Sequence, residues 1–302
     1  MNIKQLYLPI VFLLLIPFPV SAVSVPPIVS PQWLIKNLGQ EDLKIIEVSD
    51  FAAHGFGGNV PGSVHTTKSD WRYVADDGAL VHFAPKKLQK IIRDLGINNG
   101  DGVVIYYKGQ DTDEILGAFY LSWLFHLLGH TNVGVLDEGW HGWLKARGPI
   151  GDSLQESKTG NFVARPLPAL ELSTTELNQI RKYYLLVDGR PATHFAGTDK
   201  FPANPKYGRI PGSVSQPWQD YIRKDPKGML YAKTPKIPPL LKRLKINRDQ
   251  PILLTCFGGT GSAFNYVMFY AAGFKNLRLD DAGFRRWNNR NFALENPSSQ
   301  KR

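Results

Sequence analysis

The chain repeats itself, and this duplication constrains its fold more than any other feature. An apolar stretch that leads to a Pro-Gly turn occurs at residues 44–64 and again at residues 184–214. A second match is longer, because residues 101–108 resemble residues 249–256, and each run is followed by a helical pattern, a short strand and a Gly-aromatic-x-x-Trp ending. Apolar strands that alternate with helices are typical of a mostly parallel sheet. We therefore expect an α/β protein of two tandem domains, each a mostly parallel sheet flanked by helices.

Composition gives the expected boundaries. Residues 1–22 have a basic start, an apolar run and a small-residue cleavage site, which predicts an export signal peptide. Residues 151–168 are polar and rich in Pro and Gly, which is typical of a linker. These segments leave one domain at 23–150 and a second at 169–302.

The signal segment also predicts where the protein is found. Its apolar core, from Leu6 to Phe18, is shorter than the ~20 residues that span a bilayer. No cysteine lies near the cleavage site, which excludes a lipoprotein anchor. We therefore expect a periplasmic or secreted protein with no stable membrane anchor after the signal is removed.

The net charge of the chain gives little information about its binding partners. Lys and Arg number 36 against 26 Asp and Glu, and they are mostly scattered rather than massed in one run. No nucleic-acid-binding motif accompanies them, so we expect small anions as partners and no nucleic acid. We expect neither a cofactor nor a metal.

The only cysteine, Cys256, carries most of the functional signal. A lone cysteine in an exported chain suggests a reactive thiol or intermolecular pairing. It follows the apolar run 251–255 and opens the small-residue turn 257–262, which leads into a helical pattern. Amides of such a loop and the helix N-terminus favour the thiolate, which is the nucleophile. We expect a reactive thiol rather than a structural one.

The first domain lacks this thiol. Lys108 stands at the position that matches Cys256. We therefore expect the first domain to be a catalytically inactive scaffold and the second to be catalytic. The alternative, in which Lys108 forms a salt bridge or binds an anion, has less support from its neighbours.

Three chemistries suit a thiol in a glycine-rich loop. A phosphatase requires an arginine that clamps the phosphoryl group, but Ser262 stands at that position and no Arg or Lys lies between Cys256 and Lys275. A cysteine hydrolase requires a histidine base, and every histidine except His194 lies in the first half of the chain. Sulfur transfer through a persulfide requires a thiolate and a cradle of N–H donors, which the loop supplies.

The chain resembles the two-domain rhodaneses, which comprise thiosulfate sulfurtransferase and 3-mercaptopyruvate sulfurtransferase. The resemblance rests on Asp188-Gly189-Arg190, on the run 208–214, on the loop 256–262 and on the paired Gly-aromatic-x-x-Trp endings. It implies that Cys256 carries the persulfide and that Asp188 and Arg190 are a supporting pair beside the site. The implied amide donors are Phe257, Gly258, Gly259, Thr260, Gly261 and Ser262.

Two positions depart from the family pattern. Arg209 stands where the family often has histidine, and His194 stands where many members have the arginine that helps to bind the anionic donor. We expect Arg209 or His194 to compensate as a substrate-binding residue.

The leading interpretation is an enzyme, a sulfurtransferase that moves a sulfane sulfur from thiosulfate or mercaptopyruvate to a thiol or cyanide acceptor. The alternative is a non-enzymatic persulfide carrier or partner-binding protein with the same fold. A thiol redox role is weaker, because no second cysteine can resolve a disulfide.

Overall fold

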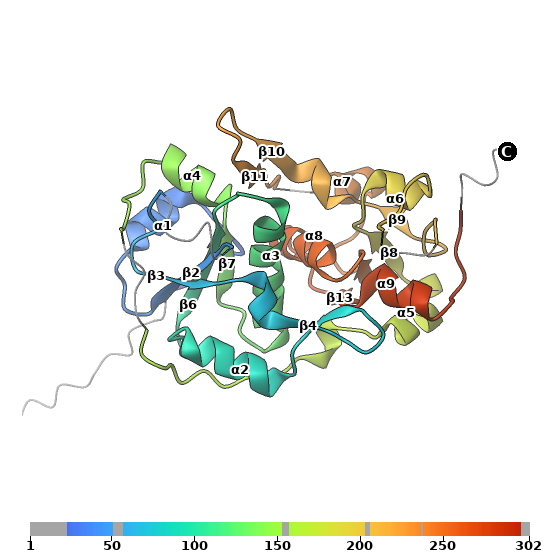
Figure 1. Cartoon of the computed structure of the whole chain (residues 1–302), viewed down its shortest axis with the longest axis horizontal. Coiled ribbons are helices and arrows are strands. Elements are labelled where there is room, and N and C mark those ends of the chain that lie inside the picture. The colour runs from blue at the N-terminus through green and yellow to red at the C-terminus, as the bar shows by residue number, and fades with distance from the viewer. Residues whose placement is uncertain (1–22, 51–56, 153–156, 203–205, 237, 297–302) are drawn as a thin grey trace, which may run out of the picture.

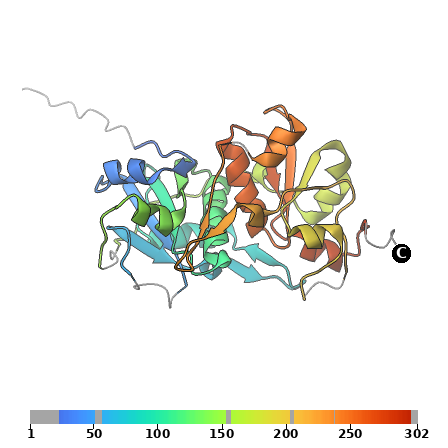
Figure 2. The ribbon, with the colours of Figure 1, turned by 90° about the horizontal axis from the view of Figure 1, so that it is seen from above.

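The protein consists of two α/β halves that lie side by side along its long axis (Figures 1 and 2). The structure, a computed structural model, describes residues 23–50, 57–152, 157–202, 206–236 and 238–296. The expected signal peptide, residues 1–22, lies outside the described residues.

A five-stranded sheet forms the first half, with the strand order β1-β7-β6-β2-β3 and every neighbouring pair parallel. All residues of the central strand β6 are buried, as expected where helices cover both faces of a parallel sheet. The strands are β1 (Ile28–Val29), β2 (Leu43–Val48), β3 (Ser63–Thr66), β6 (Gly102–Tyr107) and β7 (Val133–Leu136). The helices are α1 (Pro31–Asn37), α2 (Pro85–Asp94), α3 (Thr112–Leu127) and α4 (Gly139–Lys145).

The second half repeats this plan with a parallel sheet in the order β13-β12-β8-β9. A single parallel bridge between Glu171 and Leu279 lies where β1 pairs with β7 in the first half. The strands are β8 (Leu185–Asp188), β9 (Val214–Ser215), β12 (Ile252–Thr255) and β13 (Leu277–Leu279). The helices are α5 (Thr174–Ile180), α6 (Ala192–Ala196), α7 (Pro239–Leu244), α8 (Thr260–Ala271) and α9 (Gly283–Asn289). The two α/β halves predicted from the duplication are confirmed.

Helices α3 and α8 lie against each other between the sheets (Figure 1). Residues 114–127 of α3 are all buried, because this helix is covered by its own sheet on one side and by α8 on the other. At the contact, the rings of Phe119 and Phe264 lie 4.2 Å apart. One hydrophobic core therefore runs through both halves.

Each half also sends an antiparallel hairpin to the other half. The hairpin of β10 (Ile222–Lys224) and β11 (Leu230–Ala232) reaches the loop after β6, where the Leu230 amide donates to the carbonyl oxygen of Gly109 at 2.8 Å. The hairpin of β4 (Arg72–Val74) and β5 (Leu80–His82) reaches the loop after β12. The two hairpins therefore hold equivalent loops of opposite halves.

The expected linker packs on the first half. The amide of Phe162 donates to the carbonyl oxygen of Ile97 at 3.2 Å, and that of Arg165 donates to Leu128 at 2.9 Å. Phe162 is buried, so its ring anchors this connection. The segment that connects the two sheets is therefore held against the first half over part of its length.

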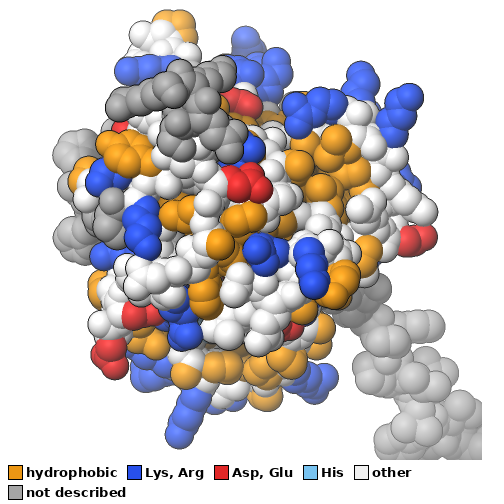
Figure 3. Space-filling view, turned by 90° about the vertical axis from the view of Figure 1, so that its right-hand side faces the viewer, with side chains coloured by type: hydrophobic (Ala, Val, Ile, Leu, Met, Phe, Trp, Pro, Cys, Tyr) orange, Lys and Arg blue, Asp and Glu red, His pale blue; other side chains and the backbone are white. Residues whose placement is uncertain are grey.

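The surface agrees with the scattered basic residues of the sequence. In the view of Figure 3, Lys and Arg side chains are dispersed among hydrophobic ones. Among the described residues, the helices are too short or too polar to cross a bilayer.

Candidate active site

Cys256 lies at the carboxyl end of β12, in the loop that leads to α8. The backbone amides of Gly258 and Ser262 donate hydrogen bonds to its sulfur, and the Ser262 hydroxyl lies 3.4 Å from the sulfur. The side chain of Cys256 is buried, but it lines a cavity between the two halves. The sulfur therefore has both amide donors and a space in which a reactant can meet it.

Other segments of the chain bind the carbonyl groups of this loop. In α9, the amides of Phe284 and Arg285 donate to the carbonyl oxygens of Cys256 and Phe257, at 2.7 and 3.1 Å. The next carbonyl along the loop accepts a hydrogen bond from Arg72 at 2.6 Å. Because these carbonyl groups are held elsewhere, the loop leaves N–H groups free to face the sulfur.

Gly259 fixes the path of the loop. Its φ is +83°, and a Cβ at this position would overlap a carboxylate oxygen of Asp281. Asp281 cannot easily move, since it accepts hydrogen bonds from the Tyr120 hydroxyl and the His82 amide, each at 2.8 Å. Only glycine satisfies both the backbone conformation and the close approach.

The thiol is not activated in the resting protein as the sequence led us to expect. Burial raises the pKa of Cys256, and the hydrogen bonds from Ser262 and Gly258 offset only part of this effect. The expectation of a favoured thiolate was wrong, because loop chemistry can be judged from the sequence whereas the depth of the sulfur cannot. The neutral thiol is the resting form at neutral pH, and the donors stabilise the anion once it forms.

The cavity beside Cys256 has a volume of about 290 Å³ and is walled by both halves. Its apolar side chains are Leu80, Leu116, Pro191, Phe201, Trp218 and Phe257, and its polar and charged side chains besides Cys256 are Lys68, Arg72, Thr112, Asp113, Arg190, Thr260 and Arg285. Gly258 and Gly261 complete the wall with backbone. The first half is therefore part of the site and more than the inactive scaffold predicted for it.

Two predicted substrate-binding residues are not brought to the cavity. Arg209 is paired with Glu295, with Nε 3.1 Å from the carboxylate. His194 is buried behind the wall of the cavity. Its ring packs at 4.3 Å on Phe201, and the ring of Phe201 packs at 4.1 Å on Phe257. Neither residue lines the space that Cys256 faces.

Asp188 and Arg190 form a buried pair at the end of β8. The Arg190 guanidinium donates to both carboxylate oxygens of Asp188, with a shortest distance of 2.7 Å, and to the carbonyl oxygen of Gly208 at 3.0 Å. It also stacks over Phe284 of α9 at 3.5 Å. This network ties β8 to the helix that holds the carbonyl groups of the cysteine loop.

Lys108, at the matching position of the first half, has structural partners. Its ammonium lies 3.8 Å from Glu47, donates to the carbonyl oxygen of Gly58 and lies over the ring of Trp140 at 4.4 Å. Burial lowers its pKa, although the nearby carboxylates of Glu47 and Glu114 favour the charged form. The salt-bridging alternative that the sequence favoured less is the one observed.

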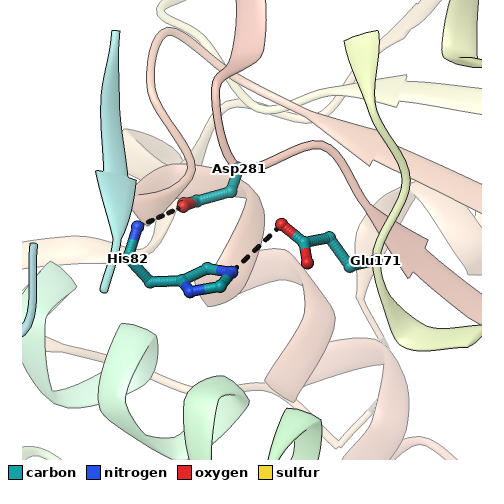
Figure 4. A group of neighbouring side chains, drawn as sticks. All are labelled: His82, Glu171 and Asp281. Atoms are coloured by element: carbon teal, nitrogen blue, oxygen red, sulfur yellow. Dashed lines mark hydrogen bonds and ion pairs between the residues drawn. The ribbon is translucent and has the colours of Figure 1, made fainter. Parts of the chain in front are cut away.

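One group of side chains has the composition of a metal site. His82, Glu171 and Asp281 approach one another where β5 meets the second half (Figure 4). The imidazole donates toward Glu171 at 3.1 Å and toward the Phe83 carbonyl oxygen at 2.7 Å. Because Asp281 already accepts hydrogen bonds and both imidazole nitrogens face acceptors, the group is a satisfied cross-domain ion pair rather than an open set of ligands.

Sequence reasoning missed the contribution of the first half to the site. Lys68, Arg72 and Leu80 line the cavity, and they belong to the segment 68–82, which consists of a short 3-10 helix and the hairpin. A signal was available, since the second half has an equivalent aromatic and basic segment at 218–232 that also forms a hairpin. Arg285 was missed as well, because the aromatic ending of the repeat was attributed to core packing.

Comparison with protein families gives the same result for both halves. The sequence profile described as "Rhodanese-like domain" matches residues 30–146 and residues 173–290. Together these ranges cover most of the chain and contain both sheets.

Individual relatives extend over nearly the whole chain. A putative thiosulfate sulfurtransferase of Synechococcus elongatus is 24% identical over 88% of this chain and 84% of its own length. A thiosulfate sulfurtransferase of Corynebacterium glutamicum is 27% identical over 90% of this chain and 92% of its own. Among solved structures, SseA from Escherichia coli, described as a 3-mercaptopyruvate sulfotransferase, superposes with a TM-score of 0.70 at 20% identity, covering 86% of this chain and 99% of SseA. At that identity the superposition establishes the fold.

Proposed function

The chain belongs to the rhodanese-like domain family, and we propose that it is a sulfurtransferase that carries sulfane sulfur as a persulfide on Cys256. The relatives named as thiosulfate sulfurtransferases support this activity. The observation that carries the proposal is the position of the Cys256 sulfur, which receives amide and hydroxyl hydrogen bonds and faces a cavity with cationic walls.

The proposed reaction has two steps. In the first, the Cys256 thiol loses its proton, and the thiolate attacks the outer sulfur of an anionic donor such as thiosulfate. A new S–S bond forms on the protein, the donor's S–S bond breaks, and sulfite leaves with the electron pair. With mercaptopyruvate the C–S bond of the donor breaks instead, and the electron pair leaves with the pyruvate enolate, which takes up a proton to give pyruvate.

In the second step, the acceptor takes the outer sulfur. Cyanide attacks it and leaves as thiocyanate, or a thiol attacks it and leaves as a persulfide, and the Cys256 thiolate is restored. The amides of Gly258 and Ser262 support this cycle because they are fixed donors that stabilise negative charge on sulfur without reorganisation.

The ionisation step has a further contributor. Arg72 is close enough to Cys256 for their charges to interact. Burial lowers the pKa of Arg72, but the charges of Tyr120, Asp281 and Cys256 together outweigh this effect and raise it. A guanidinium that is charged at every working pH stabilises the thiolate and the persulfide anion.

A carrier without small-molecule turnover was the alternative. We considered it because His194 replaces the arginine that helps to bind the donor in many family members. The cavity, however, holds other arginines. These arginines support the enzyme rather than the carrier.

We also propose that residues 1–22 direct export to the periplasm or the exterior. The proposal rests on the sequence pattern of that segment. Fractionation of cells that express the full chain, with N-terminal sequencing of the product, tests both the location and the cleavage.

A donor panel tests the activity. Thiosulfate and mercaptopyruvate are supplied to the wild type and to Cys256→Ala, with cyanide or a thiol as acceptor. We expect turnover by the wild type with at least one donor and none by the variant. Equal turnover by both proteins with every donor would contradict the proposal.

A further inference from the structure

Helix α7 and the turn that follows it carry a basic patch on the surface of the second half. Its cations are Lys242, Arg243, Lys245 and Arg248, and all four side chains are exposed. Leu244 lies among them and is 41% exposed. We call these five residues the α7 patch.

The cations of the α7 patch are not paired with acids. No Asp or Glu occurs in the sequence between Asp225 and Asp249, and the patch lies at the end of this stretch. Within the part of the chain that the structure describes, none of the four basic side chains makes a hydrogen bond or an ion pair. Their charges therefore add up to a local positive potential at the surface.

The matching helix of the first half uses its cations differently. Like α7, α2 lies between a hairpin and a buried strand. Lys87 lies 3.1 Å over the ring of Phe83, and Lys90 pairs with Asp94 at 2.6 Å. The Nε of Arg93 donates to the backbone of the connecting segment at 2.6 Å. The duplicated fold therefore employs such cations for its own contacts in one half and leaves them unused in the other.

The α7 patch combines charge with an accessible apolar side chain. Leu240 and Leu241 face the core and are buried, so Leu244 is the leucine of α7 that is available to a partner. Basic side chains around an apolar one are typical of segments that lie in a membrane interface, where the cations meet lipid phosphates and the apolar group enters the headgroup region.

We propose that the α7 patch binds reversibly to the surface of membranes that contain anionic phospholipids. The contact is an adsorption of the folded protein and requires no membrane-spanning segment. An acidic protein would be held by the same cations, but the exposed Leu244 favours the lipid surface. The proposed export through residues 1–22 also brings the chain to a membrane.

Vesicle sedimentation tests the proposal. The protein is purified as it accumulates in cells that express the full chain, and it is mixed with vesicles of phosphatidylcholine alone or of phosphatidylcholine with phosphatidylglycerol. An apolar segment such as 6–18 would bind both kinds of vesicle, so the difference between them reports the patch. We expect tighter binding to the anionic vesicles, and we expect this excess to be lost as NaCl is added, because salt screens exposed charges. Equal binding to both kinds of vesicle, or none, would overturn the proposal.

A pair of double variants locates the contact. Lys242→Gln with Lys245→Gln removes two cations from the α7 patch, and each is expected to weaken binding to anionic vesicles by roughly 5-fold. Lys86→Gln with Lys90→Gln is the matched control, because it removes two exposed lysines from α2, at the opposite edge of the molecule (Figure 1). Equal weakening in the two double variants would show an effect of net charge and overturn the assignment to α7.

Leu244→Ser separates a lipid surface from an acidic protein. We expect this variant to bind anionic vesicles roughly 3- to 10-fold more weakly, as for the partial burial of a leucine. Its binding to polyglutamate, a soluble polyanion, should equal that of the wild type. A variant that binds the vesicles as tightly as the wild type would overturn the lipid assignment in favour of an acidic partner.

Discussion

The Arg72 guanidinium donates a 2.6 Å hydrogen bond to the carbonyl oxygen of Gly258, two positions after the cysteine, although 186 residues separate the two. Arg72 belongs to the first half and Gly258 to the cysteine loop of the second. The half that lacks a thiol therefore helps to shape the loop that has one.

Ser262→Ala removes the side-chain donor nearest the sulfur. The single hydroxyl hydrogen has two acceptors, the Gly259 carbonyl oxygen at 2.8 Å and the Cys256 sulfur at 3.4 Å. The hydrogen bond from this hydroxyl lowers the pKa of Cys256, so its loss raises that pKa further. We expect alkylation of Cys256 by iodoacetamide at neutral pH to slow by roughly 2- to 10-fold.

The pH dependence of that alkylation shows whether the slower reaction comes from a higher pKa of Cys256. A shift of the whole profile to higher pH is expected in Ser262→Ala, with an unchanged plateau at high pH. An unshifted profile would show that the hydroxyl makes no contribution to the thiolate.

Gly259→Ala tests the close approach of the loop to Asp281. The new methyl group would overlap a carboxylate oxygen that Tyr120 and His82 hold in place. We expect loss of persulfide formation and a lower free energy of unfolding, measured by urea denaturation.

Gly212→Ala is the matched control. Gly212 has φ +81°, almost the same as Gly259, but a Cβ there would meet nothing within 4 Å. It therefore carries the backbone strain, about 1–3 kcal/mol, without the steric overlap. Equal losses of stability in the two variants would rule out the overlap as the cause.

Much of the fold could be predicted from the sequence, because its signals are local and repeated. The run at 251–254 is apolar, and the strand β12 that forms there is buried on both faces. The order of strands in the two sheets is the same because the underlying sequence is duplicated.

The site was harder to predict, because its walls come from distant segments. Cys256 and its loop were found from their position between a strand and a helix. Arg72 has no local signature of a binding residue, and its role appears only when the hairpin crosses to the other half. The raised pKa of Cys256 depends on burial, which tertiary packing decides.

The buried pair of Asp188 and Arg190 predicts a large effect on stability. Arg190→Ala leaves the carboxylate of Asp188 buried without its cation, so we expect a loss of about 3–5 kcal/mol in the free energy of unfolding. Arg209→Ala breaks the more exposed pair with Glu295 and should cost no more than about 1 kcal/mol. Urea denaturation of both variants gives the comparison, and similar losses would contradict the structural role of the buried pair.

His82 makes stability depend on pH. Burial lowers its pKa, but the hydrogen bond to Glu171 and the charges of Asp281 and Glu171 raise it from 6.5 to about 9. The folded protein therefore keeps a proton that the unfolded chain releases between these values. The contribution is complete below pH 6.5 and is lost as the pH rises through about 9, with a size on the order of 3 kcal/mol.

His82→Gln isolates this effect. Asp280, whose pKa burial raises to about 7, is present in both proteins, so the difference between their stability curves removes its contribution. We expect unfolding free energies of the wild type to fall more steeply than those of the variant between pH 6.5 and 9. Parallel curves would show that His82 is not protonated in the folded protein.

Direct detection of sulfur on the protein tests the central claim. The purified protein is incubated with each donor without an acceptor, the donor is removed, and the intact mass is measured before and after cyanide is added. We predict a gain of one sulfur atom, mapped by peptide analysis to Cys256, that cyanide removes as an equal amount of thiocyanate. A mass that stays unchanged with every donor, or an adduct that also forms on Cys256→Ala, would contradict the account.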